Sequence, residues 1–346
     1  MLSHCRVQLI LYKDNANERN KSLLLNCRVQ LILYKNKHMK YLKYLICLLG
    51  IAFTLYSCSS DDDNNGGNGN GTTTEEANAN RNVVTTDAAV ARLEFPKLKG
   101  GNSIVLVHRT TGDRQYDRDE VNYCVEWDCD KKAQRWSCYQ MHRGYTGSYS
   151  RVVDGYLFDP NLTTSQYLDK DYFYGSGFDH GHICPNADRK YSYKANEQTF
   201  YLTNMQPQYR RFNGYSSSGN DKGEGLWVRM EEKVRSWSPA ATTDTLYVCK
   251  GGTIDKESNI IRRIQGKLIV PRYFFMACLL KNSMGYRAIA FWAEQKDEWK
   301  TYDDLADYAI TIDELERKTG IDFFCNLPDK TENEVEKKIV LNVWGL

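Results

Sequence analysis

The sequence predicts an α+β fold with a mainly antiparallel sheet and helices packed on it. Segments with the composition of strands outnumber segments with helical spacing, and the two kinds do not alternate regularly as they do in parallel sheets. The chain has 346 residues, of which 41% are hydrophobic and 26% are charged. This composition supports a full hydrophobic core, and it excludes both low-complexity disorder and a polytopic membrane protein.

Six segments are predicted to be strands because they are rich in β-branched and aromatic residues. They are Ser103–Arg109, Tyr123–Cys129, Gln134–Met141, Thr245–Lys250, Leu268–Leu280 and Tyr286–Ala293. A short link separates the second from the third, so we expect these two to form a hairpin. Cys124 and Cys138 lie on that hairpin and are candidates for a disulfide bond, with buried free thiols as the alternative.

Three helix starts are predicted by spacing and capping. Between residues 226 and 237, apolar residues recur at helical spacing: Leu226, Trp227, Met230, Val234 and Trp237. We expect Trp227 to lie in the core and fix this helix. Residues 311–314 (Thr-Ile-Asp-Glu) and 331–334 (Thr-Glu-Asn-Glu) each match a capping box, and Gly320 is placed to end the first of these helices.

The first 80 residues are expected to lie outside the folded domain. The nonapeptide Cys-Arg-Val-Gln-Leu-Ile-Leu-Tyr-Lys occurs twice before residue 39, and two copies are too few for a repeat fold. We interpret residues 1–38 as translated upstream DNA, with the start at Met39. Residues 39–57 have the lysines, short apolar run and small-residue exit of an export signal, and the run is shorter than the ~20 apolar residues of a membrane span.

Residues 55–58 (Leu-Tyr-Ser-Cys) resemble a lipoprotein box, which implies that Cys58 is acylated and becomes the mature N-terminus. The Ser-Ser-Asp-Asp-Asp that follows is similar to the signal that sends some Gram-negative lipoproteins to the cell surface. We therefore expect an exported lipoprotein, anchored by lipid to the outer membrane or cell surface of a Gram-negative bacterium, with plain secretion or a retained anchor as the alternatives. Residues 58–80 are rich in Asn, Gly and Thr and indicate a disordered tether, which leaves one domain over residues 81–346.

The charge of the domain excludes a broad positive surface. The chain has a net charge of +2, but residues 1–57 hold nine basic and two acidic residues, and residues 77–346 hold 37 of each. A polyanionic partner therefore has to be bound in a local groove rather than by a uniform positive field.

One short motif concentrates chemically active side chains. Residues 179–185 (Asp-His-Gly-His-Ile-Cys-Pro) hold two of the six histidines of the chain. Two histidines at i and i+2 on a strand share a face, and together with Asp179 they can ligate a metal ion. Taken alone, the motif is better explained by a hydrogen-bonded surface loop.

Further motifs follow in a fixed order. Residues 200–208 read Phe-Tyr-Leu-Thr-Asn-Met-Gln-Pro-Gln, a second Asn follows the first by nine residues, and a Trp, a Glu and an Arg then lie four residues apart at 227, 231 and 235. Together with Asp-x-Gly-His, these motifs closely resemble the DNA/RNA non-specific endonucleases of the ββα-metal (His-Me finger) class, which include secreted bacterial nucleases and endonuclease G. The resemblance extends from about residue 103 to about residue 338. It implies a ββα-metal nuclease fold and Mg²⁺-dependent hydrolysis of phosphodiester bonds in DNA and RNA.

The resemblance also implies a role for each motif residue. His182 matches the general base that activates water, a task that suits a neutral imidazole. Asn213 matches the single direct protein ligand of Mg²⁺, with Mn²⁺ or another divalent cation as a substitute. Glu231 matches a carboxylate that orients metal-bound water, and Asn204 matches a residue that orients the catalytic His and the phosphate. Arg235 lies one helical turn beyond Glu231 and is placed to contact a phosphate.

Each of these residues has a simpler explanation when it is taken alone. Asn204 and Asn213 can be turn formers, and Glu231 with Arg235 can be a solvated pair worth about 0.3–0.5 kcal/mol. These separate explanations become less convincing together, because all four residues stand at the spacing that the family has.

Three features depart from the family pattern. The family has Arg where this chain has His180, so we expect a cationic His180 to bind substrate phosphate. Because His182 has to stay neutral, this arrangement predicts activity in a narrow, mildly acidic pH range. A second upstream Arg has no clear counterpart, and Arg151 is the candidate. Residues 214–225 are a Ser/Gly-rich insertion, expected to be a surface loop beside the cleft that can gate substrate.

Further basic residues are candidate phosphate contacts: Lys190, Lys194, Arg210, Arg211 and Arg229. Of these, Arg211 joins His180 and Arg235 as an expected substrate-binding residue. Two other functions stay open on the sequence. One is a phosphodiesterase for small phosphate esters, and the other is a weakly active surface lipoprotein that binds nucleic acid for uptake.

Overall fold

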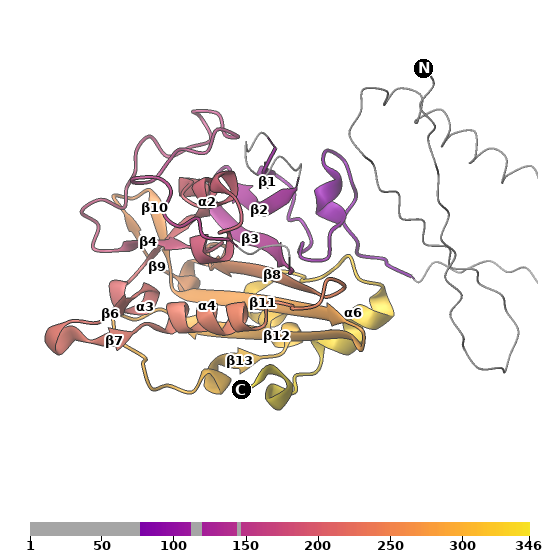
Figure 1. Cartoon of the computed structure of the whole chain (residues 1–346). Coiled ribbons are helices and arrows are strands. Elements are labelled where there is room, and N and C mark those ends of the chain that lie inside the picture. Colours follow the sequence, from indigo (N-terminus) through magenta and orange to yellow (C-terminus); the bar gives the residue numbers. More distant parts are fainter. Residues whose placement is uncertain (1–76, 112–119, 144–146) are drawn as a thin grey trace, which may run out of the picture. The chain divides into compact units, whose positions relative to one another are not determined.

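The computed structural model describes residues 77–111, 120–143 and 147–346. Its centre is a seven-stranded sheet with the order β1-β2-β3-β8-β11-β12-β13, in which all neighbouring strands are antiparallel (Figure 1). The strands are β1 (Ser103–Arg109), β2 (Val121–Asp128), β3 (Ala133–Met141), β8 (Thr245–Gly252), β11 (Tyr273–Asn282), β12 (Gly285–Glu294) and β13 (Ala309–Ile310). The predicted α+β class and the predicted hairpin of β2 and β3 are confirmed.

One predicted strand is divided in two. The segment expected as a single strand over Leu268–Leu280 consists of β10 (Leu268–Pro271), which pairs with β9 (Ile260–Ile264) in a separate two-stranded sheet, and β11, which belongs to the large sheet. Pro271 has no N–H to donate to a ladder, and the register with β9 shifts at this residue. The chain therefore passes from one sheet to the other at Pro271.

The described α-helices are α2 (Tyr193–Gln198), α3 (Arg210–Asn213), α4 (Leu226–Ser236), α5 (Ile312–Thr319) and α6 (Asp329–Glu336). The prediction for α4 is confirmed. For α5, the side chain of Thr311 caps the first turn and Gly320 ends the helix at φ 74°, as predicted. The start predicted at Thr331 is wrong, because α6 begins directly after Pro328. Pro328 has a fixed φ and no N–H, which places it immediately before a helix and leaves Thr331 within the first turn.

Helices cover both faces of the large sheet. Trp227 of α4 packs in one core cluster with Met276 of β11. Leu315 of α5 packs in a second cluster with Phe275, the strand neighbour of Met276. Since successive strand residues point to opposite faces, the two clusters lie on opposite sides of the sheet. The 3₁₀ turns are η1 (Ala88–Ala91), η2 (Asn186–Asp188), η3 (Leu202–Asn204), η4 (Gly219–Asp221), η5 (Glu257–Asn259), η6 (Leu305–Tyr308) and η7 (Leu341–Trp344).

A smaller unit holds the motif residues. β4 (Asp179–His182) pairs antiparallel with β5 (Met205–Gln208), and the chain then enters α3 and α4, so two strands are followed by helix. The insertion between α3 and α4 forms a hairpin of β6 (Tyr215–Ser216) and β7 (Gly223–Glu224). Figure 1 shows β4 and α3 at the left end of the large sheet and α6 at the right end.

The folded domain begins before residue 81. Asn78 Nδ2 donates to the Leu327 carbonyl oxygen at 2.6 Å. Asn80 Nδ2 donates to Asp322 Oδ2 at 3.0 Å and to Glu332 Oε1 at 3.1 Å. Residues 77–80, which were expected at the end of the tether, are therefore bound to the C-terminal part of the domain, and this corrects the predicted boundary.

The remaining N-terminal predictions lie outside the described residues. They concern residues 1–38, the signal over 39–57, Cys58 and the tether up to residue 76. Within the part of the chain that the structure describes, no helix has the length and apolar character needed to cross a membrane.

The described cysteines are all free thiols. Cys124 and Cys138 are direct partners across β2 and β3, but no disulfide joins them. The predicted bridge is therefore wrong and the alternative of buried free thiols is correct. Both side chains are fully buried in an apolar cluster with Phe95 and Trp136, where a thiol packs as a small hydrophobic group.

Candidate active site

An open cleft beside β4 brings most of the motif residues together. Its volume is about 490 Å³, within the range of ligand-binding pockets. The side chains that line it come from β4, from the end of α3 and from the segment that precedes β4, and they include Arg151, Tyr156, Asp179, His180, His182 and Asn213. The predicted general base and the predicted metal ligand therefore face the same space.

His182 is held so that one ring nitrogen is unused. Its backbone carbonyl accepts a hydrogen bond from Trp227 Nε1 at 3.2 Å, and its ring packs edge-on against Phe200 with centroids 5.1 Å apart. Nε2 has no hydrogen-bond partner among the described residues. Burial, reinforced by the Arg151 guanidinium, lowers the pKa of His182 to about 3. The imidazole is therefore neutral at physiological pH and able to accept a proton.

Asn213 is oriented by the first residue of β4. Its Nδ2 donates to Asp179 Oδ2 at 3.2 Å. An amide that donates through its nitrogen leaves its oxygen as the free acceptor, and oxygen is the atom that a hard cation binds. Asp179 therefore turns the amide oxygen of Asn213 away from itself.

Asn204 is a buried residue whose side chain links two backbone segments. Its Oδ1 accepts from the Cys184 N–H at 2.9 Å, and its Nδ2 donates to the carbonyl oxygens of Cys184 at 2.8 Å and of Thr199 at 2.9 Å. The side chain is fully buried, so any influence on a bound phosphate is indirect, and its predicted orienting role stays a prediction. The predicted influence on His182 is possible through the backbone, because the Ile183 N–H donates to the Asn204 carbonyl oxygen at 3.0 Å.

Glu231 lies beside a buried lysine that sequence reasoning missed. Glu231 Oε1 is 3.8 Å from Lys250 Nζ, and the two side chains are 13% and 0% exposed. Neither atom has a hydrogen-bond partner among the described residues. Burial raises the pKa of Glu231 to about 7, against the stabilising charge of Lys250. Lys250 stands in β8, where its position in a strand-like run gave no signal of this role.

Arg235 is held by an aspartate. Its Nε donates to Asp188 Oδ1 at 2.6 Å, and Asp188 Oδ2 accepts from the Tyr139 hydroxyl at 2.9 Å. Sequence reasoning also missed Asp188. The Arg235 side chain keeps 33% exposure, which leaves guanidinium N–H groups for a phosphate. Arg235 and Glu231 do not line the cleft itself.

His180 lines the cleft and is enclosed by aromatic rings. Its ring is stacked between Tyr156, at a centroid distance of 3.6 Å, and Phe173, at 4.2 Å. Its Nε2 is 2.8 Å from Asp171 Oδ2. Burial lowers the pKa of His180, although Asp171 partly opposes this shift. This environment does not favour the cationic form that the predicted phosphate contact needs, and the narrow acidic pH range for activity stays a prediction.

Arg151 lies on the cleft, where a second upstream Arg was sought. Its guanidinium lies over the Phe200 ring at 5.6 Å. Its backbone has a φ of 47°, a left-handed conformation that is uncommon for a residue other than glycine. Such strain is characteristic of functional sites.

The insertion over residues 214–225 is a hairpin fastened to the domain. Asp221 Oδ1 accepts hydrogen bonds from Arg211 Nη2 at 2.8 Å and from Trp299 Nε1 at 3.0 Å. A Cβ on Gly223 would approach the Trp299 ring to 2.4 Å, so only glycine fits there. Neither the insertion nor Arg211 lines the cleft, and the role of Arg211 as a substrate contact stays a prediction.

The other basic candidates differ in availability. Lys194 Nζ is 2.9 Å from Glu197 Oε2, and Arg229 donates to two backbone carbonyl oxygens. Lys190 and Arg210 form no ion pair within the described ranges of the chain. The latter two are therefore the better candidates for contacts with a long polyanion.

Comparison with known proteins places the chain in a family. The family described as "DNA/RNA non-specific endonuclease" matches residues 100–330. A nuclease of Nostoc sp. is 24% identical over 225 residues, which cover 63% of this chain and 76% of that protein. The mitochondrial endonuclease G of Bos taurus is 24% identical over 219 residues, with 61% and 69% covered. A crystal structure of the EndoG/EndoGI complex aligns with a TM-score of 0.49 and 18% identity, over 65% of this chain and 89% of that chain.

Across the curated relatives, the matched part spans from half to about three quarters of their own length. The match of the family covers most of the described domain and all of the motif residues. The chain belongs to the DNA/RNA non-specific endonuclease family and is an endonuclease.

Proposed function

We propose that this endonuclease hydrolyses phosphodiester bonds of both DNA and RNA with the help of Mg²⁺, and that His182 is its general base. The observation that carries the proposal is the unpartnered Nε2 of a neutral His182 in the same cleft as Asn213. A neutral imidazole without another partner is suited to take a proton from an attacking water.

The residues present fit a hard divalent cation. Asn213 would hold the ion through its amide oxygen, because its amide nitrogen is bound to Asp179. A single neutral protein ligand suits Mg²⁺, which keeps several of its own waters, and Mn²⁺ prefers similar ligands. When bound, the cation would polarise the phosphate and offset its growing negative charge.

The surrounding residues position these two groups. Trp227 fixes the His182 backbone, and Asn204 fixes the segment after it. Glu231, whose pKa is near neutrality, can hold or exchange a proton beside the site. Arg151 offers a cation to a substrate phosphate at the cleft. Contacts of this kind recognise the backbone rather than the bases, so cleavage is sequence-tolerant and weakens as salt rises.

The test is cleavage of plasmid DNA and of a long RNA by the purified chain, with Mg²⁺ or with EDTA. The expected result is metal-dependent degradation of both polymers, and a loss of at least about a hundredfold in His182→Ala. His142→Ala, a histidine outside the cleft, is the matched control. Unchanged activity in His182→Ala would exclude the assigned base.

The same assay separates the alternatives. Hydrolysis of small phosphate esters without cleavage of polymers would favour a phosphodiesterase. Binding of nucleic acid by folded protein that cleaves nothing would favour an uptake protein.

We also propose that the protein is exported and anchored by lipid on Cys58 at the outer membrane or cell surface. Support comes from the signal-like residues 39–57 and the lipobox-like residues 55–58. Cys58→Ser is expected to abolish incorporation of labelled palmitate and to release the protein from the membrane fraction. Retention of label in that variant would refute acylation at Cys58.

A further inference from the structure

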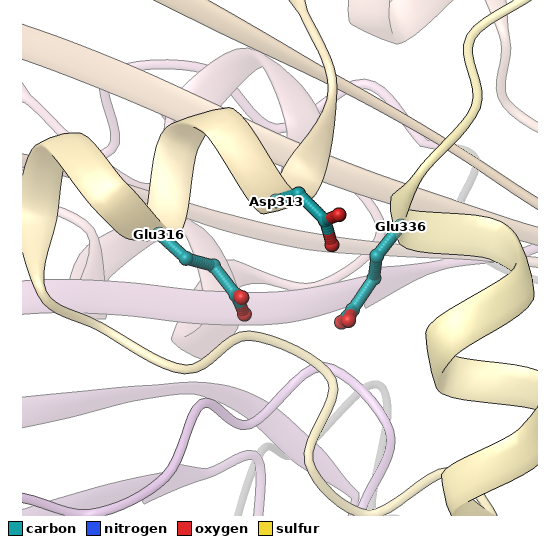
Figure 2. Close-up of side chains that lie close together, drawn as sticks. All are labelled: Asp313, Glu316 and Glu336. Atoms are coloured by element: carbon teal, nitrogen blue, oxygen red, sulfur yellow. The ribbon is translucent and has the colours of Figure 1, made fainter.

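Three carboxylates from two helices converge at the C-terminal side of the domain. Asp313 and Glu316 come from α5 and Glu336 comes from the end of α6, and Figure 2 shows all three pointing toward one another. One oxygen atom from each lies within 4.8 Å of the others. Residues this close are held together only if something offsets their mutual repulsion.

Among the described residues, no basic side chain forms an ion pair with these carboxylates. Glu336 is only 6% exposed, and its Oε1 is buried without a hydrogen-bond partner. Burial and the neighbouring carboxylates raise the pKa of Glu336 to about 10, and burial raises that of Glu316 to about 7. The described residues therefore supply no positive charge to offset the repulsion among these three carboxylates.

The geometry of the cluster suits one cation. Two oxygen atoms that each lie about 2.4 Å from one ion are at most about 4.8 Å apart, and the three oxygen atoms here all lie within 4.8 Å of one another. Glu316 is also fixed in place, because its Oε1 accepts a hydrogen bond from the Phe323 N–H at 2.8 Å. The set contains oxygen ligands alone, which favours a hard cation over Zn²⁺.

We propose that Asp313, Glu316 and Glu336 bind a calcium ion that links α5 to α6. Calcium accepts irregular sets of six to eight oxygen ligands, so water completes the shell, whereas Mg²⁺ demands near-ideal octahedral geometry. The site is separate from the cleft, since α6 and β4 lie at opposite ends of the large sheet (Figure 1). It adjoins the start of the domain, because Glu332 of α6 binds Asn80. Its role is to stabilise this end of the fold.

The experiment measures calcium binding without relying on catalysis. The purified chain, carrying Asn213→Ala to weaken binding at the cleft, is stripped of metal and titrated with Ca²⁺ or Mg²⁺. The readouts are the thermal midpoint and the luminescence of Tb³⁺, a calcium substitute. Glu336→Gln removes the central ligand charge, Asp313→Asn removes a more exposed one, and Glu334→Gln is the matched control on the solvent face of α6.

A site of this kind is expected to have a Kd of about 0.1–1 mM, as in extracellular calcium modules. At about 10 mM Ca²⁺ the thermal midpoint should rise by about 3 to 8 °C, and by less with Mg²⁺. The rise should be lost in Glu336→Gln and kept in Glu334→Gln. If Glu336→Gln does not fold, the loss of the rise in Asp313→Asn is the test.

An equal rise in Glu336→Gln, or none in the parent chain, would overturn the proposal. In the second case the carboxylates would share protons instead, and Glu336→Gln would raise the thermal midpoint without any calcium.

Discussion

Replacing the buried Lys250 with methionine tests how Glu231 keeps its charge. The side chains have similar length, so the change removes mainly the ammonium group. At the observed 3.8 Å and an effective dielectric constant of about 20, the attraction between Lys250 and Glu231 is about 4 kcal/mol. A change of one unit in pKa corresponds to about 1.4 kcal/mol, so the pKa of Glu231 in Lys250→Met should rise by as much as about three pH units.

The expected result is a shift of the acid limb of kcat/KM to higher pH, with at least a tenfold loss at pH 7.5 that recovers toward pH 9.5. The measurement is the initial rate of cleavage of a fluorescent oligonucleotide across that range. Lys256→Met, at an exposed position, is the matched control. A profile for Lys250→Met that overlays the parent profile would refute the role assigned to Lys250.

The stability of Lys250→Met gives an independent check. A carboxyl group whose pKa is raised by folding destabilises the fold as pH increases from its unfolded value, about 4.5, toward its folded value, about 7 for Glu231. In Lys250→Met the folding stability should therefore keep falling to a higher pH than in the parent chain. Near pH 4.5 the variant should be at least as stable as the parent, since a buried ammonium without a hydrogen bond has been removed.

Three further predictions follow from the geometry. Asn204→Leu should lower the free energy of unfolding by about 3 to 5 kcal/mol, because the N–H and C=O of Cys184 lose buried partners, and a urea titration showing less than about 1 kcal/mol would contradict this. Burial raises the pKa of Asp255, but hydrogen bonds led by that from Arg135 outweigh it and hold the pKa well below its usual range. Asp255→Asn should therefore destabilise the fold at pH 7, with a difference that shrinks as pH falls below about 4, and denaturation curves at both pH values test the sign. Arg151→Gln should reduce the slope of log affinity against log salt by about one, measured by fluorescence anisotropy with an oligonucleotide in EDTA, and an unchanged slope would exclude a phosphate contact.

Local patterns predict much of this fold because they depend on neighbours in sequence. β-Branched and aromatic runs locate β1, β2 and β3, and apolar spacing locates α4. The motifs predict that His182 and Asn213 share a site, and the pairing of β4 with β5, followed directly by α3, brings these two residues together. The capping pattern at Thr331 fails because Pro328, three residues earlier, starts the helix first.

The features that sequence reasoning missed depend on contacts between distant segments. His180 is enclosed by Tyr156 and Phe173, which belong to a segment without periodicity. Lys250 meets Glu231 only because β8 lies beneath α4, and a lysine at the end of an apolar run indicates an exposed strand end. Charge environments of this kind follow from the tertiary structure alone.

The hydrogen bonds of Asn78 and Asn80 to the C-terminal part of the domain also determine where an N-terminal attachment joins the enzyme. They fix the entry of the chain beside α6, at the end of the large sheet away from β4 (Figure 1). A lipid, a fusion partner or a solid support attached on the N-terminal side therefore joins the domain far from the cleft. Long polymers can then reach the cleft without passing the point of attachment, so immobilised enzyme should remain accessible to chromosomal DNA.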